Sequence, residues 1–205
     1  MKNLNQYIKE SILDDEEDLI GRVDEEIVAM FIMQHYEISH NNPLTRKTLD
    51  IKPDKGGFVV NVKDSIRVKY ESTETLTSLT NGMFRFGKVY GNFICDACTV
   101  LETLEGAPEY VENGFSCNDC KKLETLEGAP KKVENWFFCR FCDNLKSLKG
   151  APEFIGGNLI LNGCNKLKDL KYFPKHVGVD IRIPERFSED DVRKYVKKFK
   201  GKIIN

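Results

Sequence analysis

The sequence predicts a β-solenoid, in which short parallel strands from successive coils stack on one another. One apolar pattern recurs every 22 residues along most of the chain. A constant period with a constant apolar pattern indicates identical coils whose like residues form columns. Three columns define the pattern: Val89, Val111, Val133, Ile155 and Val177; Phe93, Phe115, Phe137, Leu159 and Ile181; and Cys95, Cys117, Cys139, Leu161 and Ile183.

Each repeat unit has the form V-x-x-x-F-x-C-x-x-C-x-x-L-x-x-L-x-G-A-P. The alternation in V-x-x-x-F-x-C predicts one short strand with its apolar side inward. The L-x-x-L step predicts a tight curved segment, because so short a unit has no room for a strand and a full α-helix. Gly and Pro at the end of the unit break any helix and turn the chain into the next coil.

This unit resembles the leucine-rich repeat in its short bacterial and phage form, where L-x-L-x-x-(N/C)-x-x-L-x-x-L corresponds to F-x-C-x-x-C-x-x-L-x-x-L here. The resemblance covers about residues 66–183. It implies a stack of parallel strands that serves as a binding surface. An earlier coil is visible once three inserted residues are allowed, at Val68, Tyr70, Thr73, Leu76 and Leu79.

Both ends of a solenoid need a cover, because an open end exposes core residues and a strand edge. We expect a helical N-terminal region over 1–56, the solenoid over 57–183 and a C-terminal cap over 184–205. In the cap, Ser188 and Asp191 resemble a capping box that starts a helix over 188–200. In the N-terminal region, an apolar stripe over 27–32 predicts a helix. A leading strand is expected at Phe58, Val60 and Val62.

The composition favours a cytoplasmic protein. Lys and Arg total 31 against 32 for Asp and Glu, so there is no global basic field to hold nucleic acid. No apolar stretch has the length that spans a bilayer, and no secretory h-region opens the chain. The seven cysteines occupy apolar repeat positions, which indicates a reducing interior such as the cytoplasm of a cell or of an infected host.

The three Cys-x-x-Cys pairs are compatible with either a metal site or thiols packed in the core. Their spacing fits a zinc ribbon, but the repeat period produces the same spacing without a metal. Leu161 and Ile183 replace the first Cys in later coils, which indicates a buried apolar position. We therefore expect core thiols, no metal and no cofactor; zinc binding and redox chemistry are the alternatives. The turn position, where leucine-rich repeats carry an Asn or Cys ladder, holds Cys98, Cys120, Cys142 and Cys164.

Outward-facing strand and turn positions determine what the solenoid can bind. The third complete unit places Trp136, Phe138 and Phe141 together, and Ile94 and Ile160 share the column of Phe138. Large apolar groups that point outward from a strand mark contact surfaces more often than chance. These five residues form the candidate partner-binding site. The alternative is that the N-terminal helices fold back over them.

The chain opens with Met1-Lys2, has an aromatic–aliphatic pair at Tyr7-Ile8, and continues with Ile8-Lys9-Glu10 before Ser11. These features resemble the capsid-targeting peptide of internal proteins packaged by large tailed phages. The resemblance implies a protein that is loaded into a phage head, cut after Glu10 and delivered with the DNA. The alternative is an ordinary amphipathic N-terminal helix.

The predicted function is a non-enzymatic protein-protein interaction module, phage-encoded and directed at the host, whose partner is a protein of unknown identity. No Ser/His/Asp set, phosphate loop or carboxylate pair is recognisable, and the three histidines share no repeat column. Neither a membrane nor nucleic acid is expected as a partner. Host cytoplasm or phage virion is the expected location. The alternatives are a structural or internal virion protein and a zinc-stabilised nucleic-acid-binding ribbon.

Overall fold

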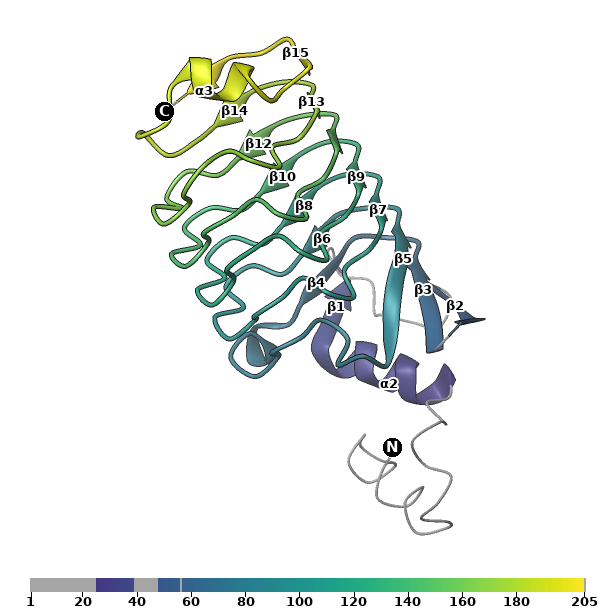
Figure 1. Cartoon of the computed structure of the whole chain (residues 1–205). Helices are drawn as coiled ribbons and strands as arrows, with labels where there is room; N and C mark the ends of the chain where they lie inside the picture. Colours follow the sequence, from purple (N-terminus) through teal and green to yellow (C-terminus); the bar gives the residue numbers. More distant parts are fainter. Residues whose placement is uncertain (1–24, 39–47, 56, 205) are drawn as a thin grey trace.

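The structure, a computed structural model that describes residues 25–38, 48–55 and 57–204, is a β-solenoid of parallel coils (Figure 1). Two sheets run along its length, and in the described part of the chain each contains eight strands. The strand at the N-terminal edge of each sheet is antiparallel to its neighbour, and the other seven run parallel. The predicted fold class is confirmed.

The strands are short, and most have only two residues. The first sheet contains, in spatial order, β1 (Tyr36–Ile38), β4 (Ile66–Val68), β6 (Phe93–Ile94), β8 (Phe115–Ser116), β10 (Phe137–Phe138), β12 (Leu159–Ile160), β14 (Ile181–Arg182) and β16 (Ile203–Ile204). The second contains β2 (Leu49–Asp54), β3 (Gly57–Val62), β5 (Phe84–Val89), β7 (Tyr110–Val111), β9 (Lys132–Val133), β11 (Phe154–Ile155), β13 (His176–Val177) and β15 (Lys198–Phe199).

Residues 22 positions apart lie side by side, as the period predicts. Phe115 pairs with Phe93 on one side and Phe137 on the other, and their rings stack at centroid distances of 5.6 and 5.2 Å. Both leucines of each L-x-x-L step are buried, and each burial stabilises the fold by about 1.5–3 kcal/mol. Each step runs between two turns: in one coil, Leu123 N–H donates to the Cys120 carbonyl at 3.2 Å before the step, and Ala129 N–H donates to the Leu126 carbonyl at 3.0 Å after it.

The prediction of one strand over V-x-x-x-F-x-C is wrong. The chain leaves the second sheet at Val89, turns a corner, and joins the first sheet at Phe93. Short polar side chains at this corner bond to the backbone of the next coil, and Asn92 Oδ1 accepts the Gly114 N–H at 3.0 Å. Such local bonds let Asn and Asp compete with regular strand pairing, which explains the corner.

The first coil contains the predicted leucines, but its strand is shifted by two residues. Ile66 pairs with Phe93, so Val68 takes the position that matches Cys95. The sequence pattern matched Tyr70, not Val68, to Cys95. Tyr70 instead begins the 3₁₀ turn η1 (Tyr70–Ser72) and is 85% exposed. A shift of two keeps the apolar side of a strand inward, so the pattern alone does not distinguish the two registers.

At the N-terminal end, the helix α2 (Glu25–His35) closes the core, and it includes the helix predicted over 27–32. Its Phe31 ring packs edge-on against Phe84 at 5.8 Å. Next to it, the buried Tyr36 hydroxyl donates to the Leu79 carbonyl at 2.6 Å. The predicted leading strand at Phe58, Val60 and Val62 is β3.

At the C-terminal end, the predicted helix over 188–200 is much shorter. The capping box of Ser188 and Asp191 is present, but α3 spans only Glu189–Arg193. The chain then forms β15 and β16, which pair with β13 and β14 as another coil. Strand pairing satisfies the exposed edges of both sheets, which a helix cannot do, so the repeat outweighs the local helical pattern. Neither α2 nor α3 has the length and apolar character of a membrane-crossing segment.

Candidate binding face and cysteine column

The five predicted site residues lie on the outer side of the first sheet and the turn that follows it. Phe138 of β10 pairs directly with Ile160 of β12 and, on its other side, with Ser116 of β8. Ile94 of β6 lies beyond Ser116 in the same column. We call this surface the aromatic face. It brings Trp136, Phe138 and Ile160 together and leaves Ile94 two coils away.

Two stacked aromatic rings form the centre of this face. The Trp136 and Phe138 rings lie 4.5 Å apart with an interplanar angle of 24°. Trp136 lies flat over the preceding coil, because a Cβ on Gly114 would come within 2.0 Å of the indole. The absence of a side chain at Gly114 therefore makes room for the indole. The result is a broad, rigid and half-buried aromatic surface.

Phe141 extends this surface into the adjoining turn. It has a positive φ of 54°, which its column neighbours Ala97, Asp119 and Gly163 share. Its ring lies against Gly163 of the next coil, where a Cβ would come within 2.3 Å of it. Phe141 remains 40% exposed. A non-glycine residue rarely adopts this backbone conformation, so the repeat geometry imposes the outward position of the ring.

Arg140, between Phe138 and Phe141, is a residue that the sequence analysis did not single out. Its column neighbours act as acceptors, since Asp96 Oδ1 accepts the Asn118 N–H and Asn118 Oδ1 accepts the Arg140 N–H. Arginine has only donors. Its buried Nε has no hydrogen-bond partner among the described residues, and its guanidinium carbon is 5.2 Å from the Phe141 ring centroid. The signal in the sequence was the one cation in a column of Asp and Asn.

The described N-terminal helix does not cover the aromatic face. α2 lies at the N-terminal end of the solenoid, beside the first coils and away from β10 (Figure 1). Its apolar side packs into the core through Val28, Phe31 and Ile32. The other N-terminal helix expected from the sequence, over the first residues, lies outside the described part of the chain.

A second column of aromatic and basic side chains lies on the outer side of the second sheet, and the sequence analysis missed it. The Lys132 ammonium lies 5.8 Å from the Tyr110 ring centroid and 5.0 Å from that of Phe154. Phe154 in turn stacks on His176 at 4.3 Å. Lys132 also pairs with Glu134 at 2.6 Å. These groups satisfy one another along the column, so we assign them to coil stacking.

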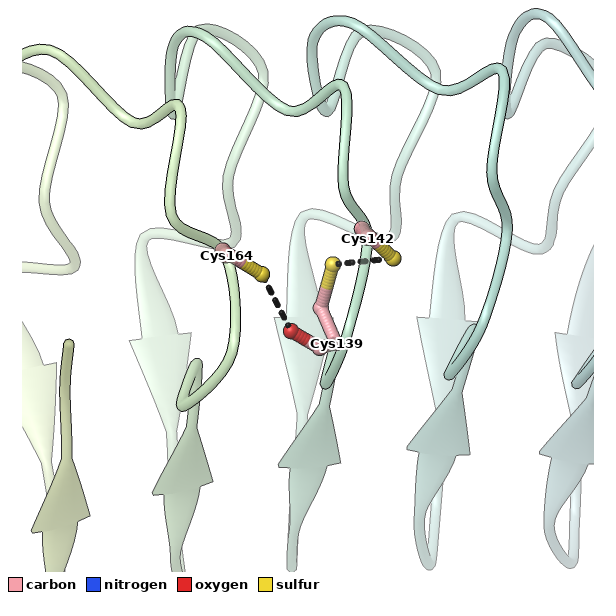
Figure 2. A group of neighbouring side chains, drawn as sticks. All are labelled: Cys139, Cys142 and Cys164. Carbon is pink, nitrogen blue, oxygen red and sulfur yellow. Dashed lines mark hydrogen bonds between the residues drawn. The ribbon is translucent and has the colours of Figure 1, made fainter.

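The seven cysteines form two adjacent buried columns along the first sheet, and all have free thiols. The strand column holds Cys95, Cys117 and Cys139, and the turn column holds Cys98, Cys120, Cys142 and Cys164. Each turn cysteine from Cys120 onward donates its S–H to the strand carbonyl of the preceding coil. Figure 2 shows this bond from Cys164 Sγ to the Cys139 carbonyl, at 3.0 Å. Equivalent bonds join Cys120 to Cys95 and Cys142 to Cys117. The thiols thus act as core groups that also tie neighbouring coils together.

One group of cysteines has the proximity that metal binding requires. The sulfurs of Cys139, Cys142 and Cys164 lie within 4.8 Å of one another, and Figure 2 shows them on two successive coils. A structural zinc site needs four ligands. No fourth His, Cys, Asp or Glu joins this group within the described ranges, and Leu161 occupies the strand position beside Cys164. The donor set therefore favours core thiols, and metal analysis of the purified protein tests this assignment.

We expect fewer than one of the seven thiols to react with a thiol reagent in the native protein, and all seven after denaturation. All seven side chains are completely buried. Burial also raises the pKa of the Cys98 thiol, which lowers the fraction of reactive thiolate. Titration with Ellman's reagent at pH 8, with and without guanidinium chloride, measures both states. Rapid reaction of several native thiols would contradict the buried column.

Comparison with known proteins adds no relative to this description. No family model, no curated protein and no solved structure matches the chain. The function must therefore be argued from the surface of the solenoid itself.

Proposed function

We propose that this protein is a non-enzymatic protein-protein interaction module of the leucine-rich-repeat type, and that it holds its partner on the aromatic face. The observation that carries the proposal is the stacked pair of Phe138, on β10, and Trp136, directly before it, on the outer side of the first sheet. Binding energy at protein interfaces concentrates in a few rigid aromatic and arginine anchors surrounded by less important contacts. The aromatic face supplies both kinds of anchor at its centre and smaller polar groups around them.

The rigidity of the solenoid supports this proposal. Phe138 is held by parallel strand pairing on both sides. Trp136, directly before β10, accepts the Phe115 N–H at its carbonyl and packs on Gly114 of the preceding coil. Side chains that are already ordered lose little entropy on binding, so more of their burial energy appears as affinity. The face is also broad and continuous from Ile160 to Trp136, which suits a protein segment better than a small molecule.

The N-terminal motif supports a more specific proposal, in which the module is carried in a phage head and acts in the host cytoplasm. The Met1–Lys2 start and the Ile8-Lys9-Glu10 sequence before Ser11 are its basis. Mass spectrometry of purified virions tests it, since the processed chain would begin at Ser11. A virion chain that still begins at Met1, or absence from virions, would contradict the virion route and leave the binding module unaffected.

The double substitution Trp136→Ala and Phe138→Ala is expected to weaken partner capture at least about thirtyfold, since the loss of even one interface anchor costs about 2 kcal/mol or more. A tagged chain, incubated with host lysate under reducing conditions, reports the capture. Both side chains lie outside the core, so circular dichroism and the thermal midpoint should change little.

Tyr70→Ala is the matched control, because Tyr70 is an exposed aromatic residue on the first coil, away from the aromatic face. It should capture the same proteins as the unmodified chain. Equal capture by the double variant and the control would show that the partner binds elsewhere.

A further inference from the structure

Some arginines of this protein form ion pairs with carboxylates, and others do not. Arg67, Arg85 and Arg193 each pair with a carboxylate, at distances up to 3.2 Å. Arg140, Arg182 and Arg186 have no ion pair with any residue that the structure describes. All three lie on or beside the C-terminal half of the aromatic face: Arg140 next to Phe138, Arg182 beside Ile160 on the neighbouring strand, and Arg186 in the turn beyond Asn162.

Acidic residues near these arginines are engaged elsewhere or remain apart from them. Asp96 accepts hydrogen bonds from Ser116 and from both the backbone and the side chain of Asn118. Asp180 accepts the Lys202 N–H at 2.9 Å and forms no ion pair with Arg182. The aromatic face therefore has unpaired guanidinium groups at one end, next to its apolar centre.

Arg140 is the clearest case of a guanidinium group without an acceptor. Its buried Nε lacks a hydrogen-bond partner in the described structure, and a buried unsatisfied donor is costly. Its guanidinium lies over the Phe141 ring, which orients the group. A carboxylate can accept two parallel N–H bonds from such a guanidinium, a stronger and more specific pair than neutral groups make.

We infer that the aromatic face recognises an extended acidic segment of a protein, in which an Asp or Glu side chain pairs with Arg140 and a neighbouring large apolar side chain packs on Trp136 and Phe138. This inference rests on the proposed function and names the chemistry of the partner. Arg182 and Arg186 receive further acidic groups. Arg182 lies two coils from Phe138, about 10 Å along the solenoid, a span of about three extended residues.

Two other kinds of partner fit the three unpaired arginines less well than an acidic segment does. A nucleic acid presents a charge at every nucleotide and needs many cations, whereas this face has three, with Asp96, Asp119 and Asp180 nearby. An apolar partner without acidic groups would cover the Arg140 guanidinium without replacing the bonds its other N–H groups make to water, at a cost in affinity. The acidic segment satisfies both the aromatic centre and the arginines.

The chain contains a single tryptophan, Trp136, so its fluorescence reports directly on this face. Random dodecapeptides displayed on yeast are selected against the purified full-length protein. The selected peptides are then synthesised in two forms, one with the Asp and Glu residues and one with Asn and Gln in their place. Fluorescence titration gives the Kd of each form, and isothermal titration calorimetry gives it for the Trp136→Ala and Phe138→Ala variant, which has no tryptophan.

We expect the selected sequences to combine Asp or Glu with a large apolar residue within three positions, and the amide form to bind about tenfold or more weakly. Arg140→Gln should bind the acidic form no better than the amide form. Arg182→Gln should give a smaller loss and serves as a second variant should Arg140→Gln not fold. Arg193→Gln, on α3, is the matched control and should leave the Kd unchanged.

The possible failures are distinguishable. Peptides that bind through Trp136 and Phe138 but show no acidic preference would overturn this inference and leave the proposed function standing. No selected peptide, or selected peptides indifferent to the Trp136→Ala and Phe138→Ala substitutions, would overturn both. Tighter binding of a single-stranded DNA oligonucleotide than of any peptide, lost in Arg140→Gln, would assign the face to nucleic acid.

Discussion

Gly128→Ala should lower the free energy of unfolding by about 4 kcal/mol, although it adds a single methyl group. Gly128 has a φ of 89°, which costs an L-residue about 1–2 kcal/mol. The new Cβ would also lie 2.4 Å from both the Leu104 carbonyl carbon and the Glu105 nitrogen of the preceding coil. Both are backbone atoms within the stack, so relief requires the coils to separate, at a further cost of about 1–3 kcal/mol.

Gly82→Ala separates the two costs. Gly82 has a similar φ of 73°, but a Cβ there would meet no atom within 4 Å. We expect it to lose only the conformational part, about 1–2 kcal/mol. Urea unfolding followed by circular dichroism compares the two variants. Equal losses would show that the contact between neighbouring coils at Gly128 is looser than the structure has it.

The close contact at Gly128 follows from the stacking of identical coils, and the sequence predicted that stacking. A column residue such as Phe115 lies beside Phe93 and Phe137 because a fixed period forces like residues into register. The same argument placed Trp136, Phe138 and Ile160 on one face. Periodicity is a relation between distant residues, and it therefore predicts contacts between coils better than the path within one coil.

The features that the sequence did not predict are those that depend on local competition. The corner between Val89 and Phe93 and the two-residue shift at Ile66 both keep the apolar side inward, so the alternation is compatible with either structure. At the C-terminus, the capping box of Ser188 and Asp191 suggested a helix over 188–200. Yet Phe199 follows Val177 by one period, and the period determined the structure.

The sequence predicted where the candidate site lies but not how its side chains pack. Period and side-chain size located the aromatic residues, but the way Trp136 lies over Gly114 depends on two columns together. Arg140 was missed because a single arginine on a surface is usually solvated. Its significance depends on which carboxylates reach it, and that is a property of the folded structure.

A rise in pH from 8.5 to 10 should destabilise the protein, with the buried thiols as the main cause. An unfolded thiol has a pKa of about 8.5, and burial raises the pKa of Cys98 above its ordinary value. Above pH 8.5 the unfolded chain loses this proton while the folded protein retains it. The unfolded state then binds fewer protons, so the free energy of unfolding falls as pH rises, by up to about 1.4 kcal/mol per pH unit for this thiol.

Cys98→Ala isolates this contribution. The variant should be less stable at pH 7, because it loses a buried sulfur, but its stability should fall less steeply between pH 8.5 and 10, by up to about 1.4 kcal/mol per pH unit. Urea midpoints at half-unit intervals under reducing conditions measure both slopes. Burial also raises the pKa of Tyr36, and the resulting loss of stability sets in toward pH 10, but this tyrosine is present in both proteins. Identical slopes would mean that Cys98 ionises as freely in the folded protein as in the unfolded chain, and would contradict a dry interior at this position.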